Sequence, residues 1–475
     1  MAENFDVVVL GGGPGGYSAA IRAAQLGMSV ALVEREHVGG TCLHRGCIPT
    51  KTYLETANRY RELQQSEQFG ITAADTSFSF SQMLARKNDV VQQLEQGIES
   101  LLKKGKIKRF NGYGRILGPS IFSPLPGTIS VENEDGSEND MLIPQQIIIA
   151  TGSMPREMKA LPFDGKHIVS SDHLVHIEEL PQSIVIVGGG VIGVEWASIF
   201  IDLGVDVTIV EAAAQLLPQA DKDVAKVVAD ELKARGVNIY TSAALQLDSV
   251  VVDDAVQATV TVNNQDVTLN AEKLFIAIGR TPNTADIGLQ NTEIERDEHG
   301  YIRVNEQYRT NEAHMYAIGD CIATPQLAHV AIREGMLAAE HIAGEVTYPL
   351  QNEHIPACIY SYPEVAYIGY TEQQAREQFD GDVAVAKMPL AAVGKARIHG
   401  NTTGFIKIIE RVSTSDVLGI HIVGANATEL IAHGSLAMVM DASVDELGLA
   451  VMAHPTVSEG LGEAALLLRK RAIHF

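Results

Sequence analysis

A glycine-rich turn that joins a strand to a helix occurs twice in this chain, and the repeat limits the folds that the chain can adopt. The first copy begins with an apolar strand at residues 7–10 and continues through a turn that contains Gly11, Gly13 and Gly16. A helical stretch and a second strand follow, and that strand ends at Glu34. A strand, a glycine turn, a helix, a strand and an acid in this order predict a β-α-β unit of a parallel sheet.

The second copy repeats this plan at residues 184–211. Its strand leads into a turn with Gly188, Gly190 and Gly193, and the next strand ends at Glu211. Each acid follows the first glycine of its turn by the same number of residues. A lone GxGxxG pattern also marks ordinary turns, but both copies have the strand, helix and acid that a dinucleotide site requires. The chain is therefore expected to bind two dinucleotides and to transfer electrons between them.

The glycines and the acids of each copy have separate expected roles. The first glycine permits the tight turn, the second lets the backbone approach a pyrophosphate, and the third lets helix and strand pack closely. The pyrophosphate would lie at the helix N-terminus, where N–H groups and the helix dipole favour negative charge. Glu34 and Glu211 would each accept hydrogen bonds from an adenosine ribose. No Lys or Arg lies between Glu211 and Asp221, so this carboxylate predicts NAD rather than NADP.

Other segments divide the rest of the chain. Apolar strands that end near Gly152 and Gly279 close the two repeated units, and a turn-rich stretch at residues 124–140 indicates strands at a loop-rich edge. Beyond residue 356, segments such as residues 405–409 indicate half-buried antiparallel strands between helices. These patterns predict four regions, at residues 1–152, 153–280, 281–349 and 350–475.

Composition excludes several functional classes. A hydrophobic share of 46% allows a large core, and a formal net charge of −23 disfavours nucleic acid as a partner. Four cysteines in 475 residues do not form a disulfide scaffold. The acidic N-terminus lacks the features of a signal or transit peptide, and no apolar run is long enough for membrane insertion. We expect a soluble protein of a reducing compartment: the cytoplasm, or an organelle matrix if a transit peptide has been removed.

Cys42 and Cys47 are the cysteine pair that points to chemistry. Residues five apart in an ideal helix are about 140° out of phase, so a bond between them needs the distortion that Gly46 and Pro49 could supply. Two buried thiols are one interpretation, and a metal site with a neighbouring histidine is another, although the spacing lacks a second ligand pair. A helix start and Lys51, one turn past Cys47, favour a redox disulfide because both stabilise a thiolate.

The segment from Gly40 to Lys51 resembles the redox-active segment of the pyridine nucleotide–disulfide oxidoreductases. Residues 150–152, 277–284 and 319–320 also match motifs of this family, and the resemblance covers essentially the whole chain. In the family, the first glycine-rich unit carries FAD and the second carries NAD(P). The resemblance therefore implies an α/β fold with two Rossmann-like dinucleotide-binding domains, a central domain that completes the FAD site and a C-terminal α+β dimerisation domain.

The resemblance also implies roles for single residues. Asp320 would bind the flavin side chain, Ala328 would lie near the flavin ring, and Lys51 would pair with Glu195 beside the reactive edge of the flavin. The residues expected at FAD are Gly11, Gly13, Gly16, Glu34, Thr41, Lys51, Gly152, Asp320 and Ala328. The residues expected at NAD are Gly188, Gly190, Gly193, Glu195, Glu211 and Gly279.

Two positions depart from the family pattern. His44 stands where relatives usually have Asn, and Thr50 stands where they usually have Ser. Neither residue is expected to do chemistry, so the departures put local packing in doubt rather than function.

His454 and Glu459 are the informative residues of the C-terminal region. Pro455 fixes the chain beside His454, and a carboxylate five residues later can orient an imidazole and stabilise its protonated form. The segment resembles the His–Glu pair with which the family exchanges protons with a dithiol substrate. Together with Cys42 and Cys47, these two residues are the expected catalytic groups.

Cysteine content narrows the substrate within the family. No cysteine follows Cys358, which argues against mercuric reductases and large thioredoxin reductases, and Glu211 argues against NADP-dependent glutathione and trypanothione reductases. The remaining branch oxidises protein-bound dihydrolipoamide. It implies a homodimer with residues 350–475 at the interface. It also implies, as partners, lipoyl domains and the acyltransferase core of 2-oxo acid dehydrogenase complexes, or the lipoyl protein of glycine cleavage. Another disulfide reductase, a flavin diaphorase and a docking subunit are the alternatives.

The implied reaction begins when His454 removes a proton from the dithiol. The resulting thiolate attacks Cys42, and Cys47 leaves as a thiolate stabilised by Lys51. Electrons then pass to FAD and on to NAD as hydride. In the implied homodimer, His454 reaches the disulfide of the partner subunit.

Overall fold

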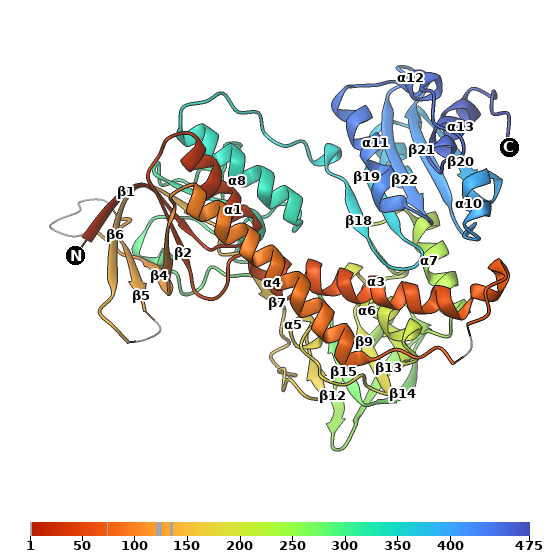
Figure 1. Ribbon diagram of the computed structural model, residues 1–475, viewed down its shortest axis with the longest axis horizontal. Helices are drawn as coiled ribbons and strands as arrows, with labels where there is room; N and C mark the ends of the chain where they lie inside the picture. The colour runs from red at the N-terminus through yellow and green to blue at the C-terminus, as the bar shows by residue number, and fades with distance from the viewer. Residues whose placement is uncertain (1, 74, 120–125, 134–135) are drawn as a thin grey trace. The chain divides into compact units, whose positions relative to one another are not determined.

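The computed structural model describes residues 2–73, 75–119, 126–133 and 136–475 (Figure 1). Contacts along the chain group these residues into two compact units, which are described separately. Unit 1 comprises Met1–Thr52, Leu84–Arg156 and Gly279–Leu350. Unit 2 comprises Tyr53–Met83, Glu157–Ile278 and Gln351–Phe475. The finer division into four regions stays a prediction.

A seven-stranded sheet forms the frame of unit 1. Its strands are β1 (Ala2–Leu10), β2 (Val30–Glu34), β3 (Lys108–Asn111), β4 (Tyr113–Ile116), β5 (Ile129–Glu132), β6 (Asp140–Ile149) and β17 (Met315–Ala317). The order is β3-β2-β1-β6-β5-β4, and β17 pairs with β6. Strands β1, β2, β3, β6 and β17 are parallel, whereas β4 and β5 form an antiparallel edge beside β6. In the predicted turn-rich stretch, residues 124–125 and 134–135 lie outside the described residues.

Apolar β-branched side chains explain the parallel part of this sheet. Val8, Val9, Ile148 and Ile149 are all fully buried, because helices cover a parallel sheet and leave little of its central strands exposed to water. The strand predictions at residues 7–10 and near Gly152 are thus confirmed.

Two helices of unit 1 pack unusually closely. Helices α1 (Pro14–Gln25) and α8 (Ala328–Ile342) lie side by side in Figure 1. A Cβ on Gly335 would lie only 2.4 Å from the carbonyl oxygen of Gly15, so a larger residue would force the helices apart. Unit 1 also contains α2 (Gly40–His44) and the strand pair β7 (Ser153–Pro155) and β16 (Arg280–Pro282). Helices α3 (Cys47–Gln64) and α4 (Phe80–Lys104) have residues in both units.

The second glycine turn lies in unit 2, in a five-stranded parallel sheet of order β11-β10-β9-β15-β8. Its strands are β8 (Ile168–Val169), β9 (Ser183–Val187), β10 (Asp206–Val210), β11 (Asn238–Tyr240) and β15 (Lys273–Ile276). Its helices are α5 (Ser171–Leu174), α6 (Val191–Asp202) and α7 (Lys222–Ala234). An antiparallel sheet follows, made of β12 (Ala243–Val252), β13 (Val256–Val262) and β14 (Gln265–Ala271).

The C-terminal part of unit 2 is an antiparallel sheet with helices, as predicted. The strands, in the order β18-β19-β22-β21-β20, are β18 (Ala357–Ile359), β19 (Val365–Gly369), β22 (Val417–Val423), β21 (Phe405–Arg411) and β20 (Val383–Pro389). The helices are α9 (Glu372–Gln378), α10 (Gly394–Ile398), α11 (Ala427–Val439), α12 (Val444–Leu449) and α13 (Glu459–Leu468). Two dinucleotide-type sheets, one parallel and one parallel except for the β4–β5 edge, and this α+β region confirm the predicted α/β fold class.

One expectation about burial was wrong. The alternation at residues 405–409 predicted a half-buried strand, but Lys407 of β21 is fully buried. Its Nζ lies 2.9 Å from a carboxylate oxygen of Asp221 and 2.7 Å from one of Glu372, and these charges offset the loss of water. Alternation of apolar and polar residues with a period of two identifies a strand. It cannot show that a cluster of charged side chains, rather than solvent, covers the polar face of that strand.

Candidate active site

The first glycine turn, residues 11–16, joins β1 to α1 with the predicted geometry. Gly11 has a φ of +102°, and a Cβ there would lie 2.3 Å from the carbonyl oxygen of Ala150. A Cβ on Gly16 would lie 1.8 Å from the carbonyl oxygen of Gly11. No described atom lies within 4 Å of a Cβ built on Gly13. Gly11 and Gly16 therefore close the turn, whereas Gly13 leaves room for a ligand against the backbone.

Glu34, at the end of β2, points its carboxylate at the first glycine turn. Oε2 accepts a hydrogen bond of 2.7 Å from the Gly12 N–H, and Oε1 accepts one of 2.8 Å from the Glu36 N–H. Each carboxylate oxygen has a further lone pair, so ribose hydroxyls can still donate to it. The predicted ribose acid thus also holds the turn.

The second glycine turn, residues 188–193, joins β9 to α6 in the same way. Gly188 has a φ of +111°, and a Cβ there would lie 2.3 Å from the carbonyl oxygen of Ala277. A Cβ on Gly193 would lie 2.0 Å from the carbonyl oxygen of Gly188, whereas no described atom lies within 4 Å of a Cβ on Gly190. The two turns therefore share one construction.

Glu211 follows β10 and repeats the contacts of the first acid. Its Oε2 accepts a 2.6 Å hydrogen bond from the Gly189 N–H, and its Oε1 accepts one of 2.6 Å from the Ala213 N–H. The residue is only 9% exposed. A buried carboxylate fixed in this position leaves little room, and no favourable charge, for a 2′-phosphate.

Two more predicted residues leave the sheet of unit 1 at the same edge as the first glycine turn. Because β1, β6 and β17 are parallel neighbours, Gly152 and Asp320 emerge beside Gly11. The Ile318 N–H donates to the carbonyl oxygen of Ile149 at 2.9 Å, which fixes the path from β17 toward Asp320. Ligands of open α/β sheets bind at this carboxyl edge.

Asp320 belongs to a small polar network that the sequence analysis missed. Its Oδ2 accepts a 2.6 Å hydrogen bond from the Ser153 hydroxyl, and Arg280 Nε donates to Ser153 Oγ at 2.7 Å. The Arg280 guanidinium lies 3.9 Å from the Asp320 carboxylate. Arg280 directly follows Gly279 in one of the motifs that match the family, and this position could have identified it as a site residue. No such signal in the sequence pointed to Ser153.

Thr41 lies in α2, which starts against the first glycine turn. The Gly39 N–H donates to the carbonyl oxygen of Gly12 at 2.8 Å, and a Cβ on Gly40 would lie 2.7 Å from Gly13 Cα. The close approach of these glycines brings Thr41 and the cysteine segment to the predicted dinucleotide site.

Cys42 and Cys47 lie on two different helices. Helix α2 ends at His44 and α3 begins at Cys47, so the helix break removes the phase problem of a continuous helix. Both side chains are partly buried, and the two cysteines interact with each other. A hydrogen bond to Cys47, burial and the charge of Cys47 raise the pKa of Cys42, while the Lys51 charge opposes the rise. The two thiols therefore do not ionise independently, and a negative charge on Cys47 keeps Cys42 protonated.

Three other predicted residues have clear local positions. Lys51 follows Cys47 by one turn of α3, and Ala328 is the first residue of α8. Glu195 in α6 is 3% exposed, and its Oε1 accepts a 3.0 Å hydrogen bond from the Tyr360 N–H. Lys51 lies in unit 1 and Glu195 in unit 2, so their pairing stays a prediction.

Gly279 also lies in unit 1, whereas the other residues predicted at NAD lie in unit 2. Its carbonyl oxygen accepts a hydrogen bond of 2.9 Å from the Arg156 N–H. Its predicted contact with NAD stays a prediction.

His454 and Glu459 form a hydrogen-bonded pair. His454 Nδ1 lies 2.8 Å from Glu459 Oε1, and Glu459 Oε2 accepts a hydrogen bond of 2.8 Å from the Thr456 N–H. The Thr456 bond and the His454 bond lower the pKa of Glu459. An ionised Glu459 holds the proton on Nδ1, which leaves Nε2 as the basic nitrogen. The His454 side chain is 80% exposed.

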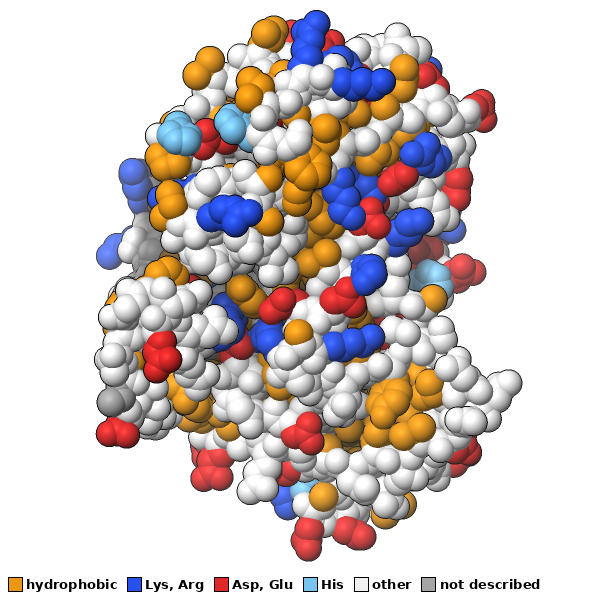
Figure 2. Space-filling model, turned by 90° about the vertical axis from the view of Figure 1, so that its right-hand side faces the viewer, with side chains coloured by type: hydrophobic (Ala, Val, Ile, Leu, Met, Phe, Trp, Pro, Cys, Tyr) orange, Lys and Arg blue, Asp and Glu red, His pale blue; other side chains and the backbone are white. Residues whose placement is uncertain are grey.

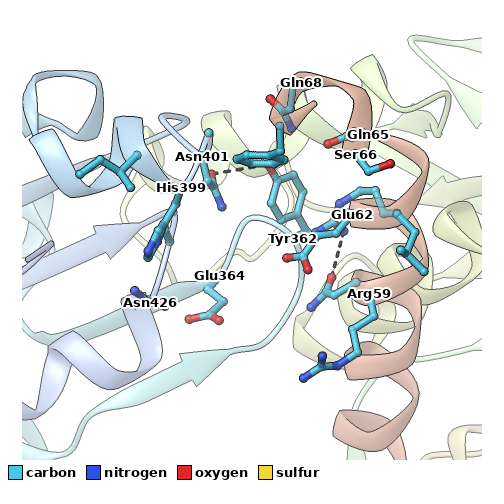
Figure 3. Close-up of a pocket in the computed structure, with 18 of the residues that line it drawn as sticks. Arg59, Glu62, Gln65, Ser66, Gln68, Tyr362, Glu364, His399, Asn401 and Asn426 are labelled. Atoms are coloured by element: carbon cyan, nitrogen blue, oxygen red, sulfur yellow. Dashed lines mark hydrogen bonds between the residues drawn. The ribbon is translucent and has the colours of Figure 1, made fainter. Parts of the chain in front are cut away.

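A pocket of about 680 Å³ lies in another part of unit 2 (Figure 3). Figure 3 shows polar side chains pointing into it, among them Gln68, Asn401 and Glu364. None of the predicted site residues lines this pocket. Among the residues that the structure describes, no cluster of three or more His, Cys, Asp or Glu could hold a metal ion. Within the same residues, no helix is both apolar and long enough to cross a membrane.

The two glycine turns fit dinucleotides on physical grounds. Helices α1 and α6 begin just after Gly13 and Gly190, and no described side chain caps either N-terminus. Their first N–H groups can therefore bind pyrophosphate oxygens, and each turn has a carboxylate for a ribose.

Known sequence profiles cover nearly the whole chain. The pyridine nucleotide–disulphide oxidoreductase profile matches residues 5–335, and the profile of that family's dimerisation domain matches residues 355–465. This chain belongs to the pyridine nucleotide–disulphide oxidoreductase family. The predicted FAD and NAD are confirmed, because the family's domains bind such dinucleotides and the dihydrolipoyl dehydrogenases that match this chain use these two.

Individual members of the family are similar over their full lengths. Dihydrolipoyl dehydrogenase of Bacillus subtilis (strain 168) is 50% identical over 476 residues, which cover 100% of both chains. Dihydrolipoyl dehydrogenase of Zymomonas mobilis is 40% identical over 479 residues, again 100% of both chains. The crystal structure of LpdA from Mycobacterium tuberculosis has a TM-score of 0.90 and 28% identity, and the match covers 98% of this chain and 99% of that one.

Proposed function

We propose that this oxidoreductase is a dihydrolipoyl dehydrogenase, which oxidises protein-bound dihydrolipoamide to lipoamide and reduces NAD. The observation that carries the proposal is the His454–Glu459 pair in a chain that also has the Cys42 and Cys47 thiols. Similarity at 50% identity to a full-length dihydrolipoyl dehydrogenase supports the substrate. Thiol–disulfide exchange between a dithiol and a protein disulfide requires two kinds of group, a base and a pair of thiols.

Cys42 and Cys47, joined as a disulfide in the oxidised enzyme, are the proposed electron acceptors from the substrate. The substrate thiolate attacks Cys42 Sγ, the bond between the two cysteines breaks, and Cys47 leaves as a thiolate. The second substrate thiolate then attacks the mixed disulfide, which releases Cys42 and closes the lipoyl disulfide. The raised pKa of Cys42 supports this division, because the negative charge rests on the leaving group. Lys51 and the α3 N-terminus stabilise that charge.

His454 is the proposed base. Its Nε2 takes the proton of the substrate thiol, and the Glu459 carboxylate stabilises the resulting imidazolium through Nδ1–H. The pKa of Glu459 is lowered, so this carboxylate stays ionised wherever the imidazole must be neutral to act.

The proposed partner in the site is a second copy of the chain. The matched dimerisation domain supports a homodimer. Exposed apolar side chains at the C-terminal end of α11 and after α12, including Val439, Met440 and Val451, support an interface built from residues 350–475. His454 is 80% exposed in one chain, and we propose that it serves the cysteine pair of the partner subunit.

The proposed cofactor contacts follow the two glycine turns. When bound, FAD and NAD supply acceptance of an electron pair and its transfer as hydride. The residues proposed to hold FAD are Gly11, Gly13, Gly16, Glu34, Thr41, Lys51, Gly152, Asp320 and Ala328. The residues proposed to hold NAD are Gly188, Gly190, Gly193, Glu195, Glu211 and Gly279.

Lipoyl domains and the acyltransferase core of 2-oxo acid dehydrogenase complexes, or the glycine cleavage lipoyl protein, are the proposed macromolecular partners. The substrate supports this choice, because dihydrolipoamide is carried on such proteins. On the face drawn in Figure 2, acidic side chains are scattered among basic, apolar and polar ones, so no single charged patch there identifies the partner. We place the enzyme in the cytoplasm or an organelle matrix.

Steady-state rates and a visible spectrum test the substrate and the redox pair together. The enzyme should reduce NAD with dihydrolipoamide and should be nearly inactive with glutathione disulfide and NADPH. Dihydrolipoamide should add a long-wavelength charge-transfer band to the flavin spectrum, and Cys47→Ser should abolish it. Turnover of the glutathione pair at a comparable rate would refute the proposed substrate.

Mixed subunits test the shared site. Cys42→Ser and His454→Ala homodimers should each be nearly inactive, because one lacks the attacked sulfur and the other lacks the base. Subunit exchange between them should restore activity, since one site of each mixed dimer has both groups. Mass spectrometry should first verify that the subunits have exchanged. If activity then does not recover, a site shared between subunits is refuted.

A further inference from the structure

Leu217 has a backbone conformation that leucine rarely adopts. Its φ is +50°, in the left-handed region that favours glycine, and the next residue is Pro218. A residue before proline favours extended backbone, which lies far from this φ. Leu217 is nevertheless buried, with 3% of the residue exposed. A strained residue of this kind persists only where its surroundings hold it, and such residues cluster at functional sites.

Leu217 contacts the second glycine turn through its backbone. Its N–H donates a hydrogen bond of 2.8 Å to the carbonyl oxygen of Gly189. Glu211 holds the other side of the same glycine, because its Oε2 accepts a 2.6 Å bond from the Gly189 N–H. The side chain of Leu216 covers this glycine, since a Cβ on Gly189 would lie 2.5 Å from Leu216 Cδ2. The N–H and the carbonyl oxygen of Gly189 are therefore both fixed by residues of the chain.

The loop that carries this leucine, residues 212–220, is anchored at both ends. Near its start, the Ser242 N–H donates to the carbonyl oxygen of Ala213 at 2.8 Å. After its end, Asp221 caps α7 and accepts a 2.9 Å hydrogen bond from the buried Lys407 Nζ. All of these contacts lie within unit 2. The loop therefore has a defined shape from contacts within the chain alone.

The first glycine turn is held in the same way, but by a glycine. The Gly39 N–H donates a 2.8 Å hydrogen bond to the carbonyl oxygen of Gly12, and Gly39 has a φ of +103°. Glycine adopts the left-handed conformation without strain, but it loses more conformational freedom when it is ordered. Leu217 has the opposite properties, because its conformation is strained and its buried side chain restricts the backbone. The strain thus accompanies a loop that stays ordered when the nucleotide has left.

We propose that Leu217 is a positioning residue of the NAD site. Its buried side chain anchors the loop, and its N–H then holds the Gly189 carbonyl, so the second glycine turn keeps its shape in the free enzyme. Binding of NAD then requires no ordering of this loop. The inference rests on the proposed NAD contacts of the turn but not on the identity of the dithiol substrate.

Leu217→Gly separates the side-chain anchor from the backbone strain. Glycine adopts this φ more easily than leucine, so relief of strain alone would leave NAD binding unchanged or make it tighter. We expect weaker binding, because a loop that holds its shape for only about a tenth of the time raises the apparent Kd about tenfold. Calorimetry with NAD and the oxidised holoenzyme measures this Kd. Leu217→Met keeps a buried apolar side chain and should restore the wild-type affinity.

Hydrogen exchange in the nucleotide-free holoenzyme reports on the loop without any measurement of activity. Peptides that cover residues 187–193 and 212–220 should exchange faster in Leu217→Gly than in the wild type, because the hydrogen bonds between them open more often. Saturating NAD should restore much of the protection. Leu216→Ala thins the cover over Gly189 but leaves the loop backbone in place, so it should cause a smaller change in the same direction.

Leu203→Gly is the matched control. Leu203 is also a buried leucine, 7% exposed, but it lies at the C-terminal end of α6, whereas the glycine turn lies at the start of this helix. The substitution should lower the free energy of unfolding and leave the NAD affinity and the exchange of residues 187–193 unchanged. Wild-type NAD affinity or wild-type exchange in Leu217→Gly would overturn the proposal. If Glu211→Ala left NAD affinity unchanged, the NAD contacts of the turn would fail, while exchange in the free enzyme would still show whether Leu217 holds the turn.

Discussion

The two glycine turns have nearly the same construction, yet they are embedded differently. In both turns, the first glycine packs against a carbonyl group at the end of a strand, and the third glycine packs against the first. A glutamate carboxylate accepts a hydrogen bond from the N–H of the second residue of each turn. The first turn adds a second wall, because Gly335 of α8 lies directly on Gly15. The second turn leads into α6, whose first residue, Val191, is 41% exposed. A short motif specifies the turn, whereas its surroundings decide how firmly a nucleotide is enclosed.

This difference matches what the two nucleotides must do. A flavin that passes electrons through many turnovers is best retained, and a wall on both sides of α1 suits retention. A pyridine nucleotide must leave after each turnover, which an open helix start permits. We therefore expect equal lesions in the two turns to have separate consequences.

Substitution of the third glycine should have the largest effect. In Gly16→Ala and Gly193→Ala, a Cβ would lie 1.8 Å and 2.0 Å from a backbone carbonyl oxygen, so each turn must open. Gly16→Ala should yield protein without flavin absorbance. Gly193→Ala should keep the flavin spectrum but lose at least about a hundredfold in kcat/KM for NAD, which corresponds to about 3 kcal/mol.

Gly97→Ala provides the control, because no described atom lies within 4 Å of a Cβ at this position in α4. It should retain both the flavin and the kinetics. If the Gly193→Ala substitution by itself caused the loss of flavin, the two turns would not act independently.

Lys407→Met should have the next largest effect and should act on unit 2. Lys407 bonds Asp221, which caps α7 at the end of the segment that begins at Glu211. Removal of the buried cation leaves unpaired carboxylates and should cost about 3–5 kcal/mol in the free energy of unfolding, measured with urea. Lys387→Met, which removes a 46% exposed partner of Asp223, should cost less than about 1 kcal/mol.

The pH dependence of this ion cluster has a definite sign. Burial opposes ionisation of Asp221 and Glu372, but the hydrogen bond from Lys407 lowers the pKa of both below the ordinary value. The wild-type cluster therefore stabilises the folded protein at pH values above about 4, which is the pKa of these carboxyl groups in the unfolded chain. This contribution to stability is lost as the pH falls. The loss of stability on acidification should be smaller in Lys407→Met. Equal slopes would contradict the assigned pKa shifts.

Replacement of the ribose acids should have intermediate effects. Glu211→Ala should raise the KM for NAD about tenfold, because a charge-assisted hydrogen bond contributes roughly 1.5–3 kcal/mol. It should also improve relative use of NADP, since the carboxylate no longer repels a 2′-phosphate. Glu34→Ala should instead speed FAD release and leave NAD kinetics unchanged. A change of NAD kinetics in Glu34→Ala would show that the acids do not act separately.

His44→Asn should have the smallest effect. His44 Nε2 lies 2.9 Å from the carbonyl oxygen of Val38, and its ring stacks on His37 at 5.1 Å. An Asn side chain can keep a polar contact but loses the ring contact, so the free energy of unfolding should change by less than about 1 kcal/mol. The flavin spectrum and the dihydrolipoamide rate should not change. A large loss of rate would assign His44 a role in the chemistry.

Local patterns made much of this molecule predictable. The glycine turns and both acids lie within single β-α-β units, so their spacing reports their geometry directly. The His454–Glu459 bond also joins residues close in the chain. The polar network of Ser153, Arg280 and Asp320 was missed because its members meet only through the fold.

Long-range charge pairs limited prediction most. Lys407 looked like the solvent side of a strand, because its partners are more than thirty positions away in the sequence. Glu334 raised no expectation in the sequence analysis, because neither its burial nor its contact with Gly319 can be inferred from a helical pattern. In both cases the sequence gives the side chain but not the polarity of its surroundings.

The hydrogen bonds from Gly12 to Glu34 and from Gly189 to Glu211 have a consequence for speed. They hold each nucleotide loop in its working conformation through contacts within the chain, so association needs no slow ordering of the loop. In the second turn, a departing reduced nucleotide and an arriving oxidised one can exchange on a scaffold that keeps its shape. Turnover can then be limited by nucleotide dissociation or by chemistry rather than by rebuilding of the receptor.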